Sequence, residues 1–133
     1  MYVALGSNLG DRAAHLHAAR QALGSLPDTT LIAASSIDET APLGGLDQPA
    51  YLNQMVLLET GLEPRELLHA LQSIEQQAGR TRHQRWGSRT LDLDIVRFGT
   101  RRVEESDLII PHPGLSERDF WRRELAELSA HER

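Results

Sequence analysis

The order of its periodic segments is the feature that most constrains how this chain can fold. Short segments that alternate apolar and polar residues, or are apolar throughout, predict strands at residues 2–5, 29–39, 51–60 and 91–98. Apolar residues at helical spacing predict helices at residues 11–23 and 64–78. The order β-α-β-β-α-β is that of the split βαβ, or ferredoxin-like, architecture. The predicted class is therefore α+β, with an antiparallel sheet that carries its helices on one face.

The rest of the chain predicts one further helix and no second domain. A short apolar segment at residues 108–110 precedes Pro111-His112-Pro113, and residues 116–129 have the spacing of a last helix. We find no internal repeat, low-complexity tract or linker, and 133 residues are enough to bury a core. We therefore expect residues 1–133 to form a single domain.

The composition excludes several classes of protein. The formal net charge is −5, whereas a general nucleic-acid binder is usually basic. The chain has no cysteine, which excludes a disulfide framework, a thiol nucleophile and a zinc–thiolate site. Met1 leads directly into the first predicted strand and no apolar run approaches membrane-spanning length, so we expect neither a signal peptide nor a membrane span. We expect a cytoplasmic monomer that binds a small anionic ligand.

Asp92 and Asp94 are the strongest candidates for a functional site. They stand two apart in a predicted strand, so their carboxylates project from one face while Leu91, Leu93 and Ile95 form an apolar face on the other side. Like charges at this distance need a cationic partner. Either Mg²⁺, which prefers oxygen ligands, or arginine can supply it. The structural alternative is a pair of solvated acids on an edge strand.

Arginines crowd the segment immediately before these carboxylates. All fourteen basic residues of the chain are arginines, and four of them precede the predicted strand, namely Arg80, Arg82, Arg85 and Arg89. The planar guanidinium group can bind phosphate oxygens in bidentate fashion. Together with the acids, these arginines suggest a site for a polyphosphate and its Mg²⁺. The alternative is a solvated, charged loop.

Aromatic and amide side chains suggest a second part of the site. Tyr51 and Asn53 are also two apart on a predicted strand. They are either a core aromatic beside an edge amide, or a stacking ring beside a hydrogen-bonding group for a flat heterocycle. Phe120 is either a second such ring or a core residue.

Three more polar residues have both a structural and a functional interpretation. His112 lies between two prolines that fix its direction, which suits a structural and a functional histidine equally. Gln72 and Glu75 share one face of a predicted helix, and solvation of the helix surface is their default interpretation.

Four segments together resemble one known family. In order and spacing they are similar to 6-hydroxymethyl-7,8-dihydropterin pyrophosphokinases, enzymes of folate biosynthesis, and the similarity extends from residue 2 to about Phe120. The segments are Ala4–Arg12 (ALGSNLGDR), Thr40–Asn53 (TAPLGGLDQPAYLN), Arg85–Ile95 (RWGSRTLDLDI) and Ile110–Pro113 (IPHP).

The resemblance implies a ferredoxin-like fold and a reaction. Members of this family transfer pyrophosphate from ATP, their co-substrate, to the hydroxymethyl group of the pterin and release AMP. By match to the family motifs, Asp92 and Asp94 would hold two Mg²⁺ ions. Arg80 and Arg89 would neutralise the phosphates that are transferred, a role that suits phosphoryl-type chemistry.

The resemblance also implies two binding surfaces. The pterin pocket would consist of Thr40, Pro42, Leu43, Tyr51, Asn53 and Phe120, with Trp86 closing over the site. The residues in contact with or near ATP would be Gln72, Glu75, Arg82, Arg85, Ile95, His112 and Arg118.

The chain departs from the family pattern in three places, one of which is a loop between Arg82 and Trp86 about one residue shorter than in some members. Gly114 stands where members often have arginine, and Trp121-Arg122-Arg123-Glu124 follows Phe120 where an apolar Pro-Leu-type segment is usual. The sequence also has two alternative functional interpretations. A catalytically altered paralogue that binds a pterin or nucleotide should have lost an arginine or aspartate of the motif, and none is lost. An RNA-binding module of ferredoxin-like fold needs exposed aromatics and a basic sheet face, which the composition does not favour.

Overall fold

The computed structural model describes residues 1–41, 50–78 and 91–132. Its main strands and helices, in chain order, are β1 (Tyr2–Ser7), α1 (Arg12–Gly24), β2 (Thr29–Ala34), β3 (Asp38–Thr40), β4 (Tyr51–Thr60), α2 (Pro64–Gln77), β5 (Asp92–Arg97), β6 (Val103–Glu105), β7 (Leu108–Ile110) and α3 (Asp119–Leu128). None of the helices in these ranges is long and apolar enough to cross a membrane.

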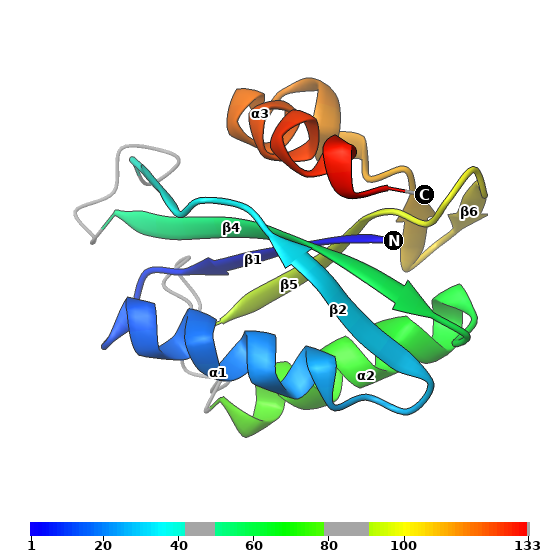
Figure 1. Ribbon diagram of the computed structural model, residues 1–133, viewed down its shortest axis with the longest axis horizontal. Coiled ribbons are helices and arrows are strands. Elements are labelled where there is room, and N and C mark those ends of the chain that lie inside the picture. Colours follow the sequence, from blue (N-terminus) through cyan, green and yellow to red (C-terminus); the bar gives the residue numbers. More distant parts are fainter. Residues whose placement is uncertain (42–49, 79–90, 133) are drawn as a thin grey trace.

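The main sheet has the strand order β2-β4-β1-β5, with β3 paired to β4, and all of these pairs are antiparallel. Helices α1 and α2 cover one face of this sheet, and α3 lies across the other face (Figure 1). The predicted α+β, ferredoxin-like βαββαβ fold is confirmed. The expectation that the helices lie on one face holds for α1 and α2, whereas the structure places α3 on the second face.

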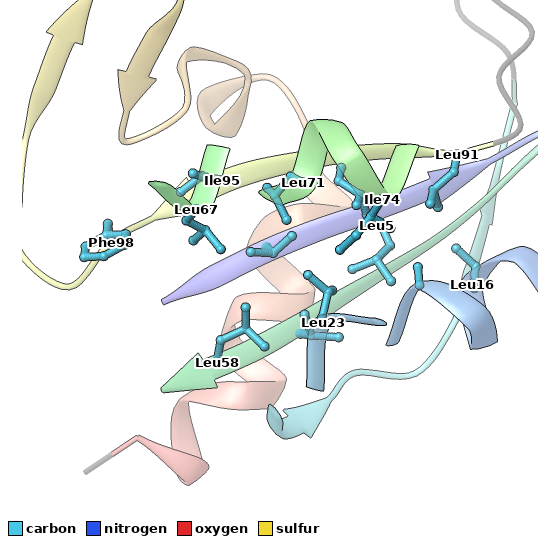
Figure 2. Close-up of a cluster of buried hydrophobic side chains, with 14 of the residues drawn as sticks. Leu5, Leu16, Leu23, Leu58, Leu67, Leu71, Ile74, Leu91, Ile95 and Phe98 are labelled. Atoms are coloured by element: carbon cyan, nitrogen blue, oxygen red, sulfur yellow. The ribbon is translucent and has the colours of Figure 1, made fainter. Parts of the chain in front are cut away.

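Two apolar clusters hold these layers together, one on each face of the sheet. The cluster beneath α1 and α2 contains Val3 and Leu5 of β1 and leucines of both helices, including Leu16, Leu23, Leu67 and Leu71 (Figure 2). The cluster beneath α3 contains the alternate strand residues, Tyr2, Ala4, Met55, Leu57 and Val96, packed against Trp121, Leu125 and Leu128. Because both faces are covered, every residue of β1 is buried.

Local signals in the sequence start the two helices of the first face. The Asp11 side chain accepts a hydrogen bond from the Ala14 backbone N–H at 3.1 Å and so caps α1. At α2, Pro64 occupies the first turn, and Glu66 reaches back to the Glu63 backbone N–H at 2.8 Å in a capping box. These bonds satisfy backbone donors that have no partner within the helix.

The prediction of one strand over residues 29–39 is wrong, because the structure divides this segment into β2 and β3. The division falls at Ser35 and Ser36, each of which makes a hydrogen bond between a backbone group and a side chain. The buried Ser35 accepts a hydrogen bond from the Met55 backbone N–H with its Oγ at 3.0 Å. Ser36 donates its backbone N–H to Glu127 of α3 at 2.8 Å. Ser35 still donates its backbone N–H to Met55 O at 2.9 Å, so the two side-chain bonds mark the point where the regular β2–β4 pairing ends.

Glu124 of α3 is an acid enclosed in the second apolar cluster. Only 1% of the residue is exposed, and neither carboxylate oxygen makes a hydrogen bond of normal geometry within the described residues. Burial raises the pKa of Glu124 to about 9, and the neighbouring Asp38 carboxylate adds to the shift. Arg123 opposes the shift and Glu127 adds to it. Glu124 therefore keeps its proton at neutral pH.

Glu124→Gln removes this titration and should stabilise the protein at alkaline pH. Unfolded Glu124 ionises above about pH 4.5 and folded Glu124 only near pH 9. The folded state therefore binds more protons, and the free energy of unfolding falls as pH rises through this window. We expect the variant to be more stable than the wild type by about 2 kcal/mol near pH 8 and little changed near pH 4. Urea unfolding at both pH values checks this, and parallel pH dependence of the two proteins would contradict it.

Candidate functional site

The β5 strand separates its side chains as its alternating pattern predicts. Leu91, Leu93 and Ile95 are buried in the cluster beneath α1 and α2. Asp92 and Asp94 project from the opposite face and are partly exposed, with 40% of the Asp94 side chain accessible. The prediction that the two carboxylates share a face opposite an apolar one is confirmed.

Strand pairing brings the second candidate group onto the same face. Gly6 of β1 is the partner of Asp92 on one side and of Asn53 on the other. Asn53 and Asp92 thus lie in one row across the sheet, about 10 Å apart at the usual strand spacing. Gly6 contributes no side chain between them, and a Cβ at this position would lie 3.4 Å from Asn53 Oδ1 and 3.6 Å from the Tyr51 ring. Gly6 therefore adds no side chain of its own between the amide and the carboxylate, and the Asn53 amide and the Tyr51 ring lie close to its backbone.

The amide end of this row is held by a hydrogen bond to β3. Asn53 is buried, and its Nδ2 donates to Thr40 Oγ1 at 2.7 Å. Thr40 pairs with Tyr51 across the β3–β4 ladder, so the two residues are neighbours. Tyr51 is partly exposed and lies on the same face of β4 as Asn53. The Asn53 amide nitrogen is engaged by Thr40, and the amide oxygen Oδ1 is the hydrogen-bond acceptor that lies near Gly6.

His112 extends the carboxylate end of the row. Its backbone N–H donates to Val96 O at 2.9 Å, which ties residue 112 to β5. Its ring Nδ1 accepts the Gly114 N–H at 2.9 Å, so the neutral ring carries its proton on Nε2. Nε2 lies 3.6 Å from Asp94 Oδ1. The ring thus offers an N–H donor beside the acid pair.

Trp121 orients the cationic and imidazole groups of the site, and sequence reasoning missed this role. Its ring is buried and meets His112 edge-on at a centroid distance of 4.9 Å. The Arg118 guanidinium lies over the same ring at 4.4 Å. The available signal was the apolar stripe Trp121, Leu125, Leu128 at helical spacing, which faces the sheet. Phe120 packs at the edge of this cluster and is only partly buried.

Gly114 leaves room for Arg118 to adopt this position. A Cβ at residue 114 would lie 3.2 Å from the Arg118 guanidinium carbon and 3.2 Å from His112 Nδ1. The space near residue 114 therefore holds the guanidinium of Arg118, which stands at the start of α3. The departure from the family pattern at residue 114 coincides with an arginine folded back from the next turn.

The two polar residues of α2 differ in environment. Gln72 is exposed, as expected for a residue on a helix surface. Glu75 is buried, and its Oε2 accepts the Leu93 backbone N–H at 2.8 Å. The prediction that Glu75 is a solvated surface residue is wrong, because this turn of α2 packs against β5. The sequence alone does not show this contact between a helix and a strand. The bond fixes the backbone between Asp92 and Asp94.

A cavity of about 240 Å³ opens beside Asp94. Three predicted site residues line it, namely Asp94, Ile95 and His112. Leu68 of α2 and Asp107 and Ile109 of the β6–β7 hairpin line it too, and sequence reasoning did not single them out. The structure thus brings an apolar wall and polar groups together next to the acid pair.

Comparisons with known proteins identify the family. A family model described as 7,8-dihydro-6-hydroxymethylpterin-pyrophosphokinase matches residues 2–130. The chain belongs to this pyrophosphokinase family. Similar proteins are named 2-amino-4-hydroxy-6-hydroxymethyldihydropteridine pyrophosphokinase. The protein of this name from Bacillus subtilis (strain 168) is 47% identical in sequence, over 96% of this chain and 76% of the relative. Those from Haemophilus influenzae and Pseudomonas aeruginosa are 44% and 45% identical, each over 97% of this chain and 81% and 80% of the relative.

Several residues matched to the pyrophosphokinase motifs lie outside the described ranges. They are Pro42, Leu43, Arg80, Arg82, Arg85, Trp86 and Arg89. The described residues of the same motifs are spread over β3, β4, α2, β5 and the start of α3, and the sheet gathers the acid and amide groups on one face.

The donor set suits the Mg²⁺ that the pyrophosphokinase resemblance implies. Among the described residues, no three histidine, aspartate or glutamate side chains converge on one point. Asp92 and Asp94 offer oxygen donors alone, and they are partly exposed. Mg²⁺ commonly binds one or two protein carboxylates and completes its octahedron with waters and substrate phosphates. Two accessible carboxylates beside an open cavity meet this requirement.

The Glu75 contact can be tested by stability measurements. Glu75→Ala leaves the Leu93 amide buried without an acceptor, so we expect a loss of about 2 kcal/mol in the free energy of unfolding. Glu75→Gln retains an acceptor oxygen and should lose less than about half of that. Gln72→Ala, on the exposed face of the same helix, is the matched control. Urea unfolding checks the three variants, and equal stability of Glu75→Ala and Gln72→Ala would contradict the assignment.

Proposed function

We propose that this protein transfers pyrophosphate from ATP to the hydroxymethyl group of 6-hydroxymethyl-7,8-dihydropterin and releases AMP, as a step of folate biosynthesis. The observation that carries the proposal is the row Asn53, Gly6, Asp92 on one sheet face in a chain of the pyrophosphokinase family. The amide proposed to bind the heterocycle and the acid proposed to bind the metal lie about 10 Å apart, and the residue between them is a glycine. This span suits a two-ring heterocycle whose side arm reaches toward a phosphate chain. We propose residues 1–133 as one catalytic domain.

The pterin binds at the amide end of the row. Asn53 Oδ1 accepts a hydrogen bond from the flat ring, because Nδ2 is already bonded to Thr40. Tyr51 supplies one stacking surface and Phe120, on the helix that covers this face, supplies the other. The family motifs add Pro42, Leu43 and Trp86 to this pocket.

The phosphates of ATP bind at the acid end. Asp92 and Asp94 would hold the two Mg²⁺ ions, and bound Mg²⁺ would supply positive charge to offset the charge that develops on the phosphates during transfer. His112 donates from Nε2, and Arg118 is kept near it by Trp121. By their motif positions, Arg80 and Arg89 neutralise the transferred phosphates.

The remaining motif positions serve the nucleotide. By match to the family, Arg82 and Arg85 contact ATP, and Gln72 and Glu75 lie near it. The cavity beside Asp94 accommodates the nucleoside, with Leu68, Ile95 and Ile109 as its apolar wall.

The reaction is an in-line displacement at the β-phosphorus. The hydroxyl oxygen of the pterin bonds to this phosphorus, and the hydroxyl proton is released to solvent. The bond from the β-phosphorus to the oxygen that bridges it to the α-phosphorus breaks, and AMP leaves with that oxygen. Charge neutralisation and alignment carry such a step, so the side chains act chiefly by position. A monomeric state and a cytoplasmic location stay predictions of the sequence.

Asp94→Asn is expected to abolish most turnover without unfolding the protein. The amide keeps the size of the side chain and removes the charge that a metal requires, so AMP release should fall by about a thousandfold or more. Glu104→Gln, an exposed acid on β6, is the control for loss of one charge. AMP is measured by chromatography after incubation with ATP, Mg²⁺ and the pterin, and thermal unfolding confirms the fold. Full activity of folded Asp94→Asn would overturn the assignment.

Chelation of divalent cations is expected to stop the reaction reversibly. With excess EDTA, AMP release should fall to background, because the two carboxylates then repel the phosphates instead of binding them through a metal. Added Mg²⁺ in excess of the chelator should restore the wild-type rate. Turnover that persists in EDTA would exclude the proposed role of the acids.

A further inference from the structure

Arg12, the first residue of α1, contacts β3 and the residue directly before β4, which border the amide end of the site. Its Nη1 donates to the Ala50 carbonyl at 2.7 Å and lies 3.3 Å from Glu39 Oε2. The Arg12 and Glu39 side chains are 30% and 61% exposed, so solvent screens much of this ion pair and the bond to Ala50 is the stronger contact. A charged donor to a backbone carbonyl is among the stronger hydrogen bonds in proteins.

The two partners of Arg12 stand directly before residues of the site. Glu39 directly precedes Thr40, and Ala50 directly precedes Tyr51. Thr40 and Tyr51 are partners in the β3–β4 ladder. Side chains alternate along β3, so Glu39 points toward α1 while Asp38 and Thr40 point toward the site. Arg12 therefore lies on the opposite side of the sheet from the Asn53–Thr40 bond and does not reach the site itself.

The strand that Arg12 supports is short. The β3 strand has 3 residues, and within the described ranges it pairs only with β4. A strand of this length has few ladder bonds of its own and depends on other contacts for a fixed position. A second arginine of α1 contributes to holding the segment that leads into β3. Arg20 donates to Gln54 Oε1 at 2.6 Å, and Gln54 Nε2 in turn donates to Ser35 O at 2.6 Å.

We propose that Arg12 is a positioning residue for the heterocycle pocket. By binding Ala50 and Glu39 from the α1 side, it holds Thr40 and Tyr51 at the separation that the site requires. Rigid placement before binding lowers the entropy cost of ordering these groups around the ligand. Loss of Arg12 should therefore weaken binding of the pterin and leave the phosphate end unchanged. This inference rests on the proposed function, because it takes the pterin as the ligand of the pocket.

The test is the steady-state kinetics of Arg12→Ala with each substrate varied in turn. We expect the KM for the pterin to rise about tenfold, the size of one charge-assisted hydrogen bond. The kcat and the KM for ATP should stay within about twofold, because uniform binding of one substrate is lost and not transition-state stabilisation. Arg12→Lys keeps a cation that can reach one partner and should recover about half of the effect on a logarithmic scale.

Two further variants make the comparison specific. Arg101→Ala removes an exposed arginine that pairs with Glu63 at 3.1 Å, far along the chain from β3, and should leave both KM values unchanged. Glu39→Gln weakens the Arg12 contact from the other side at an exposed residue, and should raise the KM for the pterin about threefold. Because Glu39 is exposed, this variant and Arg12→Lys decide the question if Arg12→Ala does not fold.

Amide hydrogen exchange supplies a readout that does not depend on turnover. In Arg12→Ala, amides of residues 38–40 and 51–53 should exchange about tenfold faster, while those of α2 and β5 keep the wild-type rates. An unchanged KM for the pterin, a loss shared equally with ATP, or the same change in Arg101→Ala would overturn the inference. Failure of the proposed function is a separate result, since the wild-type protein would then release no AMP.

Discussion

The two-residue period of β5 is the constraint on which the site depends. Leu91, Leu93 and Ile95 can be buried beneath α1 and α2 only in one register, and that register points Asp92 and Asp94 to the opposite face. A slip by one residue would place both acids in the apolar cluster and expose the leucines. Burial of the apolar side chains thus determines the direction in which the carboxylates of Asp92 and Asp94 point. Glu75 secures the same register from α2 through the Leu93 amide.

The second face of the sheet combines a structural and a functional task. Helix α3 covers the middle of this face with Trp121, Leu125 and Leu128, and the same tryptophan contacts His112 and Arg118 at the edge of the site. The packing that completes the core therefore also fixes the direction of two polar groups. The cost of this arrangement is the enclosure of Glu124, whose raised pKa keeps the acid neutral beside Asp38.

Much of the fold was accessible from the sequence because its signals are local. The β4 strand has the predicted bounds, and α2 and β5 agree to within a residue or so at each end, since strong periodicity and helix start signals mark them. The division of residues 29–39 was missed because it depends on Met55 and Glu127, which are distant in sequence. The burial of Glu75 and the role of Trp121 were missed for the same reason.

The residues alone were sufficient to establish which groups could do the chemistry. The spacing of Asp92 and Asp94 places them on one face of any strand, and the motif order is sufficient to recognise the family. Only the folded sheet could show that Asn53 and Asp92 meet across Gly6, and that Thr40, Trp121 and Arg12 support the two ends of that row. The physical reason is that side-chain alternation is a property of one strand, whereas register between strands follows from how several segments bury their apolar faces together.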